Sequence, residues 1–381
     1  MRMSKNFLTF LVAAIALNIF PTTATAAEVP ASFAFQGSGY GHGVGMSQIG
    51  ARAKALAGES ATAILQYYYT GTSVETVTDT QILRINIGHL LTSAKLRSDS
   101  NGAQLQLFAG DLGETQTDTP LLSLPSKTTL NLTLTNNLIA LSTTRGSKNT
   151  PITIGSSFTL RWTGTRYLDG PMTLISLTSG NVVNRYRHGQ MNFKIIRDKT
   201  LGKRIEIINS VRLQDEYLWG ISEVPSSWPA AALEAQAIAS RTYAYAKSFK
   251  VRTACDCHLY GSISDQTFAG YSKEGEARFG ELWKAAVNRT AGSIITYAGA
   301  PITAYFTSSS GGVTETSEHA WGTATPYTVS VPDTASVDTA LNPRFASWVR
   351  EISQAIIAQA FLLPDVVSLN VLEMNPAGTV A

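Results

Sequence analysis

The stretch from Trp219 to Tyr245 constrains the fold more than any other part of this 381-residue chain. Residues 230–245 contain neither Gly nor Pro, and seven of these sixteen residues are alanine. Pro229 suits the first turn of a helix, where its missing N–H costs nothing, and alanine favours a closely packed helix. Because backbone just ahead of Pro225 avoids the helical region, the sequence predicts a strand that ends at Glu223 and then a buried helix.

Glu223 is the candidate acid in this stretch. It lies among Ile221, Ser222 and Val224 at the expected mouth of the helix, where apolar neighbours remove water from its carboxylate. Loss of water raises the pKa of a carboxyl group, and a raised pKa is what a general acid needs. The alternative is a surface glutamate in an ordinary strand-to-helix turn.

The N-terminus has the pattern of an export signal. Basic Arg2 and Lys5 precede an apolar run over 7–20, and Ala24-Thr25-Ala26 fits a cleavage site. The apolar run is shorter than the roughly twenty residues of a membrane span. We therefore predict a signal peptide over 1–26 and a secreted protein, with an uncleaved anchor as the alternative.

The net charge, the motifs and the cysteines argue against binding of nucleic acid, a nucleotide or a cofactor. The net charge of +3 is too small to indicate nucleic-acid binding, and no G-x-G-x-x-G or G-K-[ST] pattern indicates a nucleotide. The chain has two cysteines, Cys255 and Cys257, followed by His258. Their spacing is not C-x-x-C and a zinc site needs a fourth ligand, so no cofactor is the first expectation. A structural zinc on these three residues and a Cys255–Cys257 disulfide are the alternatives.

The rest of the chain separates into regions of different pattern. Residues 27–75 hold a glycine-rich loop and two expected helices, over 49–56 and 60–69, the second capped by Ser60. Residues 76–185 alternate in the manner of strands and form a β-rich insert. Further predicted elements are a strand at 204–209, a helix at 281–290, a hairpin over 293–307, an amphipathic helix within 343–363 and a strand at 366–374.

Several motifs resemble the stage II sporulation protein D family. They include Gly220, Ile221, Glu223 and Pro225, the run EAQAIASRTY at 234–243, and GHGVGMSQIGA at 41–51. The resemblance extends to Asp265-Gln266, the Ser308–Gly312 loop, Trp321 and Tyr327. It implies a peptidoglycan lytic transglycosylase in which Glu223 is the catalytic acid. The substrate-binding residues that it implies are Arg241, His42, Gln48, Gln266, Ser309, Ser310 and Tyr327.

We also predict how these residues act. Arg241 would position the substrate or hold Glu223 in place. The loop around His42 would pack beside the Glu223 turn, where His42 would be a glycan ligand or a second proton carrier; a purely structural histidine is the alternative. No second carboxylate partner for Glu223 is visible, which favours a nonhydrolytic route.

The expected fold is α+β, with mixed sheets and a buried alanine-rich helix after the catalytic turn. The expected parts are the signal peptide (1–26), a glycine-rich segment (27–75), the β-rich insert (76–185), the catalytic domain (186–340) and a tail (341–381) that is truncated relative to full-length relatives. The expected partner is the glycan strand of the cell wall. The family commonly has basic residues where this chain has Glu234 and Val329. Two alternatives therefore remain: a noncatalytic activator of a wall amidase, and a wall-binding scaffold.

Overall fold

The computed structural model describes residues 28–381, so the expected signal peptide lies outside the described residues. Two compact units divide the chain. Among the described residues, one unit comprises residues 28–35 together with Val349–Val371, and the other comprises Gln36–Trp348 together with Leu372–Ala381. Within residues 28–381, no helix is long and apolar enough to cross a membrane.

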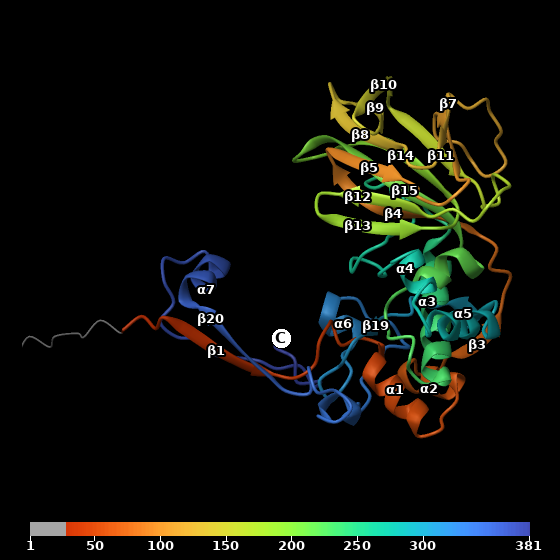
Figure 1. Cartoon of the computed structure of the whole chain (residues 1–381). Coiled ribbons are helices and arrows are strands. Elements are labelled where there is room, and N and C mark those ends of the chain that lie inside the picture. The colour runs from red at the N-terminus through yellow and green to blue at the C-terminus, as the bar shows by residue number, and fades with distance from the viewer. Residues whose placement is uncertain (1–27) are drawn as a thin grey trace, which may run out of the picture. The chain divides into compact units, whose positions relative to one another are not determined.

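Two large sheets form much of the second unit (Figure 1). The seven-stranded sheet has the order β16 (Leu259–Tyr260), β4 (Ile82–Leu91), β15 (Gly202–Arg212), β14 (Gln190–Asp198), β11 (Ser157–Trp162), β6 (Gln104–Ala109) and β7 (Leu122–Pro125). The six-stranded sheet has the order β10 (Lys148–Gly155), β9 (Leu138–Arg145), β8 (Thr129–Thr135), β5 (Ser93–Arg97), β12 (Ile175–Ser179) and β13 (Val182–Tyr186).

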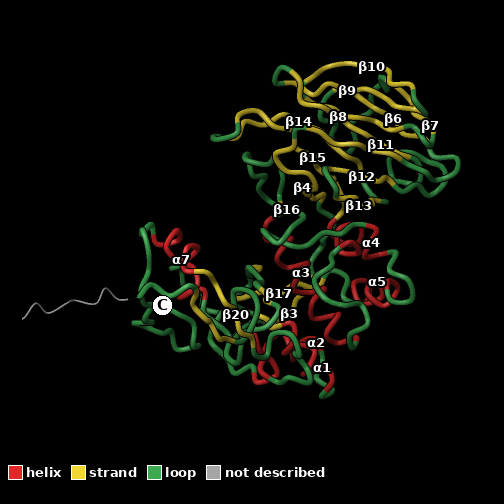
Figure 2. Tube along the Cα trace, turned by 60° about the vertical axis from the view of Figure 1, so that its left-hand side comes forward, coloured by secondary structure: helices red, strands yellow, loops and turns green. Residues whose placement is uncertain are grey.

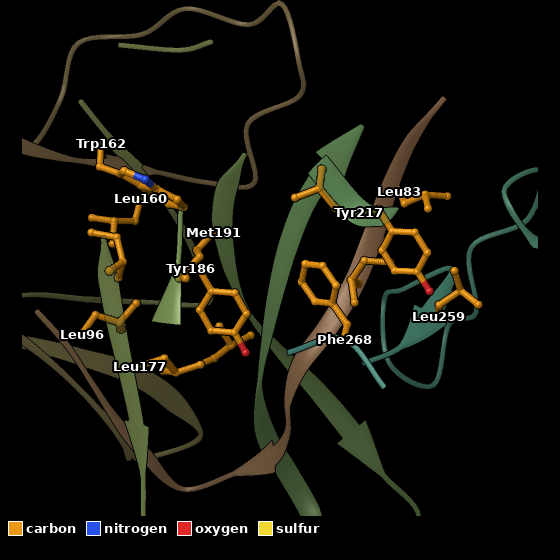
Figure 3. Close-up of a cluster of buried hydrophobic side chains, with 14 of the residues drawn as sticks. Leu83, Leu96, Leu160, Trp162, Leu177, Tyr186, Met191, Tyr217, Leu259 and Phe268 are labelled. Carbon is orange, nitrogen blue, oxygen red and sulfur yellow. The ribbon is translucent and has the colours of Figure 1, made fainter. Parts of the chain in front are cut away.

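The two sheets share one apolar core. Leu96 and Leu177 from the six-stranded sheet are buried in the same cluster as Leu160 and Met191 from the seven-stranded sheet (Figure 3). Burial alternates along β5, where Ala94 and Leu96 are buried and their neighbours are not, as a strand covered on one face requires. The alternation of apolar and polar residues in β5 therefore reflects the packing of one face of its sheet against the core.

The seven-stranded sheet also joins two regions that the sequence separates. β4, β6, β7 and β11 come from the expected insert, whereas β14, β15 and β16 come from the expected catalytic domain. β16 pairs with β4 in parallel and β15 pairs with β4 antiparallel, so the sheet is mixed, as the α+β prediction requires. The expected boundary at 185/186 falls at the end of β13, and the regions on either side of it share this sheet.

α1, α2 and α5 lie around α3 (Ala230–Lys247) (Figure 2). As predicted, α3 begins directly after Pro229. Twelve of its eighteen residues are buried, and it packs against α1, α2 and α5. Ser47 and Ser60 cap α1 and α2 by accepting hydrogen bonds from Gly50 N and Ala63 N. The helices are α1 (Gln48–Leu56), α2 (Ala61–Tyr68), α3, α4 (Tyr271–Glu274), α5 (Gly280–Arg289), α6 (Ser317–Trp321) and α7 (Gln354–Phe361), with the 3-10 turn η3 (Thr334–Val337).

The chain does not enter the Glu223 turn as a strand. β15 ends at Arg212, and a π-helical turn, η1 (Leu213–Tyr217), and a 3-10 turn, η2 (Leu218–Gly220), follow it. The predicted strand end at Glu223 is therefore wrong. A π-helical turn and a 3-10 turn instead connect the sheet to the segment that carries Glu223.

Short sheets complete the second unit. β17 (Ser293–Tyr297) pairs with β18 (Ala300–Pro301) through the predicted Ala298-Gly299 turn, and β3 (Ser73–Thr76) pairs with the other edge of β17. The second strand of this hairpin, predicted over 302–307, does not form as one strand, and β18 ends just before it at Pro301. Its last part, β19 (Phe306–Thr307), pairs instead with β2 (Met46–Ser47) in the glycine-rich segment.

The first unit corrects the prediction for the tail. Residues that we expected in one helix form β20 (Trp348–Ser353) and then α7, and β20 pairs with β1 (Ser32–Gly37). This pairing satisfies backbone groups from opposite ends of the sequence, and local periodicity does not register such long-range contacts. The strand predicted at 366–374 does not form.

Candidate functional site

Glu223 lies in a turn that is fastened to a neighbouring loop by its backbone. Ser222 N donates to Thr267 O at 2.8 Å, and Ala269 N donates to Gly220 O at 2.8 Å. The two short segments thus run side by side like a fragment of antiparallel sheet. This pairing fixes the direction in which the Glu223 side chain leaves the turn.

The Glu223 carboxylate is half-buried and receives a direct hydrogen bond from the same loop. Thr267 N donates to Glu223 Oε1 at 2.5 Å. Burial raises the pKa of Glu223, whereas the hydrogen bonds from Thr267 and the positive charge of Lys273 oppose this rise. The raised pKa is the one expected from the sequence, and it means that Glu223 holds its proton to a higher pH than an ordinary glutamate does.

An open cavity of about 390 Å³ lies at this turn. Its walls come from the Glu223 turn, from Ala269 and from the region of α4. The lining residues are Ser222, Glu223, Val224, Pro225, Ala269, Ser272, Lys273 and Glu276. Lys273 is almost fully buried, and its Nζ donates to Val224 O at 2.6 Å. A lysine therefore ties the backbone of the acid-bearing turn to α4.

A second carboxylate, Glu276, lines the same cavity. Ser226 Oγ donates to Glu276 Oε2 at 2.7 Å, and Lys273 Nζ lies 3.7 Å from this oxygen. Glu223 therefore shares its cavity with a carboxylate that the sequence analysis did not identify. The sequence hides this pair because Glu276 lies 53 positions after Glu223 and reaches the cavity only through the fold.

Arg241 is not on the cavity wall. Its side chain is 0% exposed, and its Nε donates to Asp79 Oδ2 at 2.8 Å. Its remaining nitrogens donate to Thr290 Oγ1, Ser293 O and Val287 O at 3.3, 3.4 and 3.0 Å. The predicted contact with substrate is thus contradicted, because the guanidinium is enclosed by protein acceptors at the C-terminal end of α5.

The two glutamines predicted to bind substrate are buried against α3. Gln48 Nε2 donates to Gln236 Oε1 at 3.2 Å. Gln266 accepts from Tyr217 Oη at 2.7 Å and donates to Ser240 O at 3.4 Å. Both amides hold other elements on the helix, so the structure corrects their assignment as ligand-binding groups.

The glycine-rich loop pairs with residues 305–315. Tyr40 N donates to Ser309 O at 2.9 Å, and Glu315 N donates to Gly43 O at 2.9 Å. His42 is exposed, and its ring lies 5.1 Å from Trp321 and 6.1 Å from Tyr305 between ring centroids. Among the described residues, the ring of His42 packs against Tyr305 and Trp321 and not against the Glu223 turn, where we expected it. The aromatic surface formed by His42, Tyr305 and Trp321 is open to solvent at Trp321, which is 47% exposed.

The serine loop and Tyr327 are occupied by internal contacts. Ser309 Oγ accepts from Asn342 Nδ2 at 2.9 Å, and Ser310 Oγ donates to Asp333 Oδ2 at 2.6 Å. Tyr327 is buried, and its hydroxyl accepts from Thr303 N at 3.1 Å. Ser309 and Tyr327 therefore stabilise the fold here, and only Ser310 retains a partly exposed side chain.

Cys255 and Cys257 form a disulfide, and both are fully buried. His258 follows them, and its Nδ1 accepts from Arg84 N at 2.9 Å. While the disulfide is intact, neither sulfur is a thiolate, which is the form that binds zinc. A structural zinc on these three residues would require the reduced protein.

Sequence reasoning missed three residues of the site: Thr267, Lys273 and Glu276. The donor of Thr267 is a backbone N–H, which no side-chain motif marks. Lys273 and Glu276 stand three positions apart in YSKEGE, a spacing that places side chains on one face of a helical turn. That spacing beside the Asp265-Gln266 motif is the signal that would have identified them.

The comparisons with known proteins match the part of the chain that holds this cavity. A family model described as SpoIID, stage II sporulation protein, matches residues 202–297. This range contains Glu223, Thr267, Lys273 and Glu276.

Two curated relatives from Bacillus subtilis (strain 168) match over similar lengths. The chain is 35% identical to an amidase enhancer over 113 residues, which is 30% of this chain and 14% of that protein. It is 35% identical to stage II sporulation protein D over 130 residues, which is 31% of this chain and 37% of that protein. The chain therefore spans well under half the length of the curated relatives that it matches.

Proposed function

Residues 202–297 are a domain of the stage II sporulation protein D family, and we propose that the protein is an exported peptidoglycan lytic transglycosylase with Glu223 as its acid. One observation carries this proposal. Within the matched range, a half-buried carboxyl group with a raised pKa opens on a cavity large enough for a sugar ring. Burial raises the pH up to which such a group stays protonated, and the open cavity gives it access to a glycosidic oxygen.

The reaction needs one carboxyl group that acts twice. Glu223 donates its proton to the glycosidic oxygen as the bond from that oxygen to the anomeric carbon breaks. The 6-hydroxyl oxygen of the same muramic residue then bonds to the anomeric carbon, and its proton passes to the Glu223 carboxylate. The products are a 1,6-anhydro end and a new hydroxyl end, and no water is consumed.

Lys273 and Glu276 are the other charged residues at the cavity. The nearby ammonium of Lys273 favours the ionised form of Glu223 after the first proton transfer. Ser226 and Lys273 hold Glu276 at the cavity wall. An ordinary glycosidase would use a second carboxylate to activate water or as a nucleophile. Because Glu276 lines the same cavity, hydrolysis is the alternative reaction that the experiment must distinguish from transglycosylation.

Product analysis separates the two reactions. Purified protein is incubated with peptide-free glycan strands, and the ends of the products are identified by mass spectrometry, since an anhydro end is lighter than a reducing end by one water. We expect anhydro ends. Reducing ends without anhydro ends would make the protein a hydrolase and refute the transglycosylase proposal.

The match to an amidase enhancer favours a second candidate function, activation of a cell-wall amidase. In that case the protein would raise the rate at which an amidase releases peptides from intact wall, without cutting glycan itself. Adding the protein and its Glu223→Gln variant to a purified wall amidase tests this. Equal stimulation by both forms, with no glycan cleavage, would favour the activator over the enzyme.

Export is part of the proposal. The Cys255–Cys257 disulfide is typical of proteins that leave the reducing cytoplasm, and it supports the signal peptide predicted over 1–26. Fractionation of cells that express the full chain tests this point. Finding the full-length protein in the cytoplasm would contradict it.

A further inference from the structure

A second cavity, of about 500 Å³, is lined in part by Phe268, from the same loop whose Thr267 N binds Glu223. Thr267 N binds the Glu223 carboxylate and Ala269 lines the Glu223 cavity, whereas Ser262, Ser264 and Phe268 line the second cavity. Tyr186 and Phe268, which also line this cavity, belong to the buried hydrophobic cluster that Figure 3 shows. Its polar side chains come from Asn86, His89, Asn184, Tyr260, Ser262 and Ser264.

A buried carboxylate, Glu206, lies beneath this cavity. Glu206 is in the middle of strand β15, and its side chain is 0% exposed. Leu90 N donates to Glu206 Oε1 at 2.9 Å, and Asn86 Nδ2 donates to Oε2. Burial raises the pKa of Glu206. A buried carboxylate is costly, so these dedicated donors indicate that the carboxylate has a task other than packing.

That carboxylate orients His89. The Nδ1 of His89 lies 2.9 Å from Glu206 Oε2 and 3.1 Å from Oε1. Because a carboxylate accepts, Nδ1 carries the proton, and Nε2 is left for another partner. The His89 side chain is 40% exposed at the cavity, and the Tyr260 ring packs edge-on against it at 5.0 Å between centroids.

The backbone is deformed to build this pair. The register between β15 and β4 shifts twice, between Ile205 and Ile207 and between Ile207 and Ile208. Leu90, whose N–H binds Glu206, has a φ of 54°, in a region that leucine rarely adopts. Bulges and strained residues of this kind gather at functional sites. The shifted register and the strained Leu90 lie directly beside Glu206 and His89, and they indicate a function for this pair without reference to any pKa.

We propose that this cavity binds a neutral, hydroxyl-rich ligand, a saccharide ring, and that His89 Nε2 hydrogen-bonds one of its hydroxyl groups. The lining offers hydroxyl and amide groups beside the aromatic edge of Tyr260, and it includes no Lys, Arg, Asp or Glu. An anion would find no lysine or arginine in this lining. A metal ion would lack ligands, since residues 28–381 contain no cluster of three or more His, Cys, Asp or Glu suited to one. The assignment does not depend on the chemistry at Glu223.

The test uses the full chain with Glu223→Gln, so that no probe is cleaved. N-acetylchitotriose and maltotriose, both neutral, are titrated while the His89 ring signal is followed by ¹H–¹³C NMR. Glycerol phosphate is the anionic probe. The His89 signal is assigned by comparison with His89→Ala. We expect a saturable shift of this signal with a neutral saccharide.

Two variants complete the test. His89→Ala lacks the reporting ring, so its binding is measured by titration calorimetry, and it should be weaker by at least about tenfold, the loss expected for one good hydrogen bond. Ser264→Trp, at an exposed position on the rim, should block the cavity without touching the buried pair, and the His89 signal reports whether that variant is folded. A response to N-acetylchitotriose alone would identify an acetamido sugar, and a response to both sugars would identify a saccharide of broader kind. No shift, a shift with glycerol phosphate only, or binding that persists in Ser264→Trp would overturn the proposal.

Discussion

Thr267 donates its backbone N–H to Glu223 Oε1 at 2.5 Å across 44 positions of sequence. This bond places a half-buried carboxyl group at the cavity mouth and partly offsets the rise in its pKa that burial causes. The position of the candidate acid thus depends on loop 265–269 as much as on the turn that carries it. Changes to this surrounding structure should change how the acid titrates.

Replacing Lys273 by methionine should move the pH dependence of glycan cleavage. Lys273 lowers the pKa of Glu223, so the variant should have a still higher Glu223 pKa. A general acid works while protonated, and activity is lost as pH rises through its pKa. The basic limb of kcat/KM should therefore move to higher pH in Lys273→Met. Lys284→Met is the control, because Lys284 contacts Glu281 and Glu274 outside the Glu223 cavity. An equal shift in both variants would remove Lys273 from the site.

Arg241→Ala should act on stability rather than on binding. Its ion pair with Asp79 is buried, and removing one partner of such a pair costs about 3–5 kcal/mol of unfolding free energy. Arg289→Ala breaks a pair with Glu234 in which Arg289 is about half exposed, and we expect a loss below about 1 kcal/mol. Urea unfolding measures both. A stable Arg241→Ala protein with weakened glycan binding would return Arg241 to the substrate site.

The glycine-rich loop should tolerate no side chain at Gly45. Its φ is 75°, and an added Cβ would collide with the backbone oxygen of Tyr305. Gly299 has a φ of 77° but open space around it, so Gly299→Ala reports the backbone strain alone, about 1 kcal/mol. Gly45→Ala should therefore lower the unfolding free energy clearly more than Gly299→Ala, as thermal unfolding can measure. Equal effects would mean that the loop moves aside.

The purified, unreduced protein should contain no titratable thiol. Because Cys255 and Cys257 are paired, a thiol reagent should react only after denaturation and reduction. The assay counts thiols in denatured protein with and without reductant, alongside zinc analysis of the native protein. Two free thiols and one bound zinc per chain would contradict the disulfide and restore the zinc alternative.

Local features of the fold could be predicted from the sequence because they depend on near neighbours. The alanine run after Pro229 predicted α3, Ser60 predicted the start of α2, and Ala298-Gly299 predicted the hairpin turn. The tail could not be predicted, because β20 exists only through pairing with β1 at the other end of the chain.

The site was predictable in part for the same reason. Apolar neighbours in sequence indicated the raised pKa of Glu223. Motif membership, however, did not distinguish a ligand-binding side chain from a buried one. Arg241 and Gln266 belong to the family motifs, yet both are enclosed by partners that only the fold brings to them. Glu276 was missed because sequence distance conceals its place in the Glu223 cavity.

The most direct test compares glycan cleavage by the wild-type protein with that by Glu223→Gln and Glu276→Gln. The glutamine at 223 can still accept from Thr267 N, and because the folded-state pKa of Glu223 is raised, losing its charge should not lower the unfolding temperature at neutral pH. We predict anhydro ends from the wild type, a loss of at least about 100-fold in rate for Glu223→Gln, and unchanged product ends for Glu276→Gln. Anhydro ends formed at the wild-type rate by a folded Glu223→Gln protein would contradict the assignment of Glu223 as the acid.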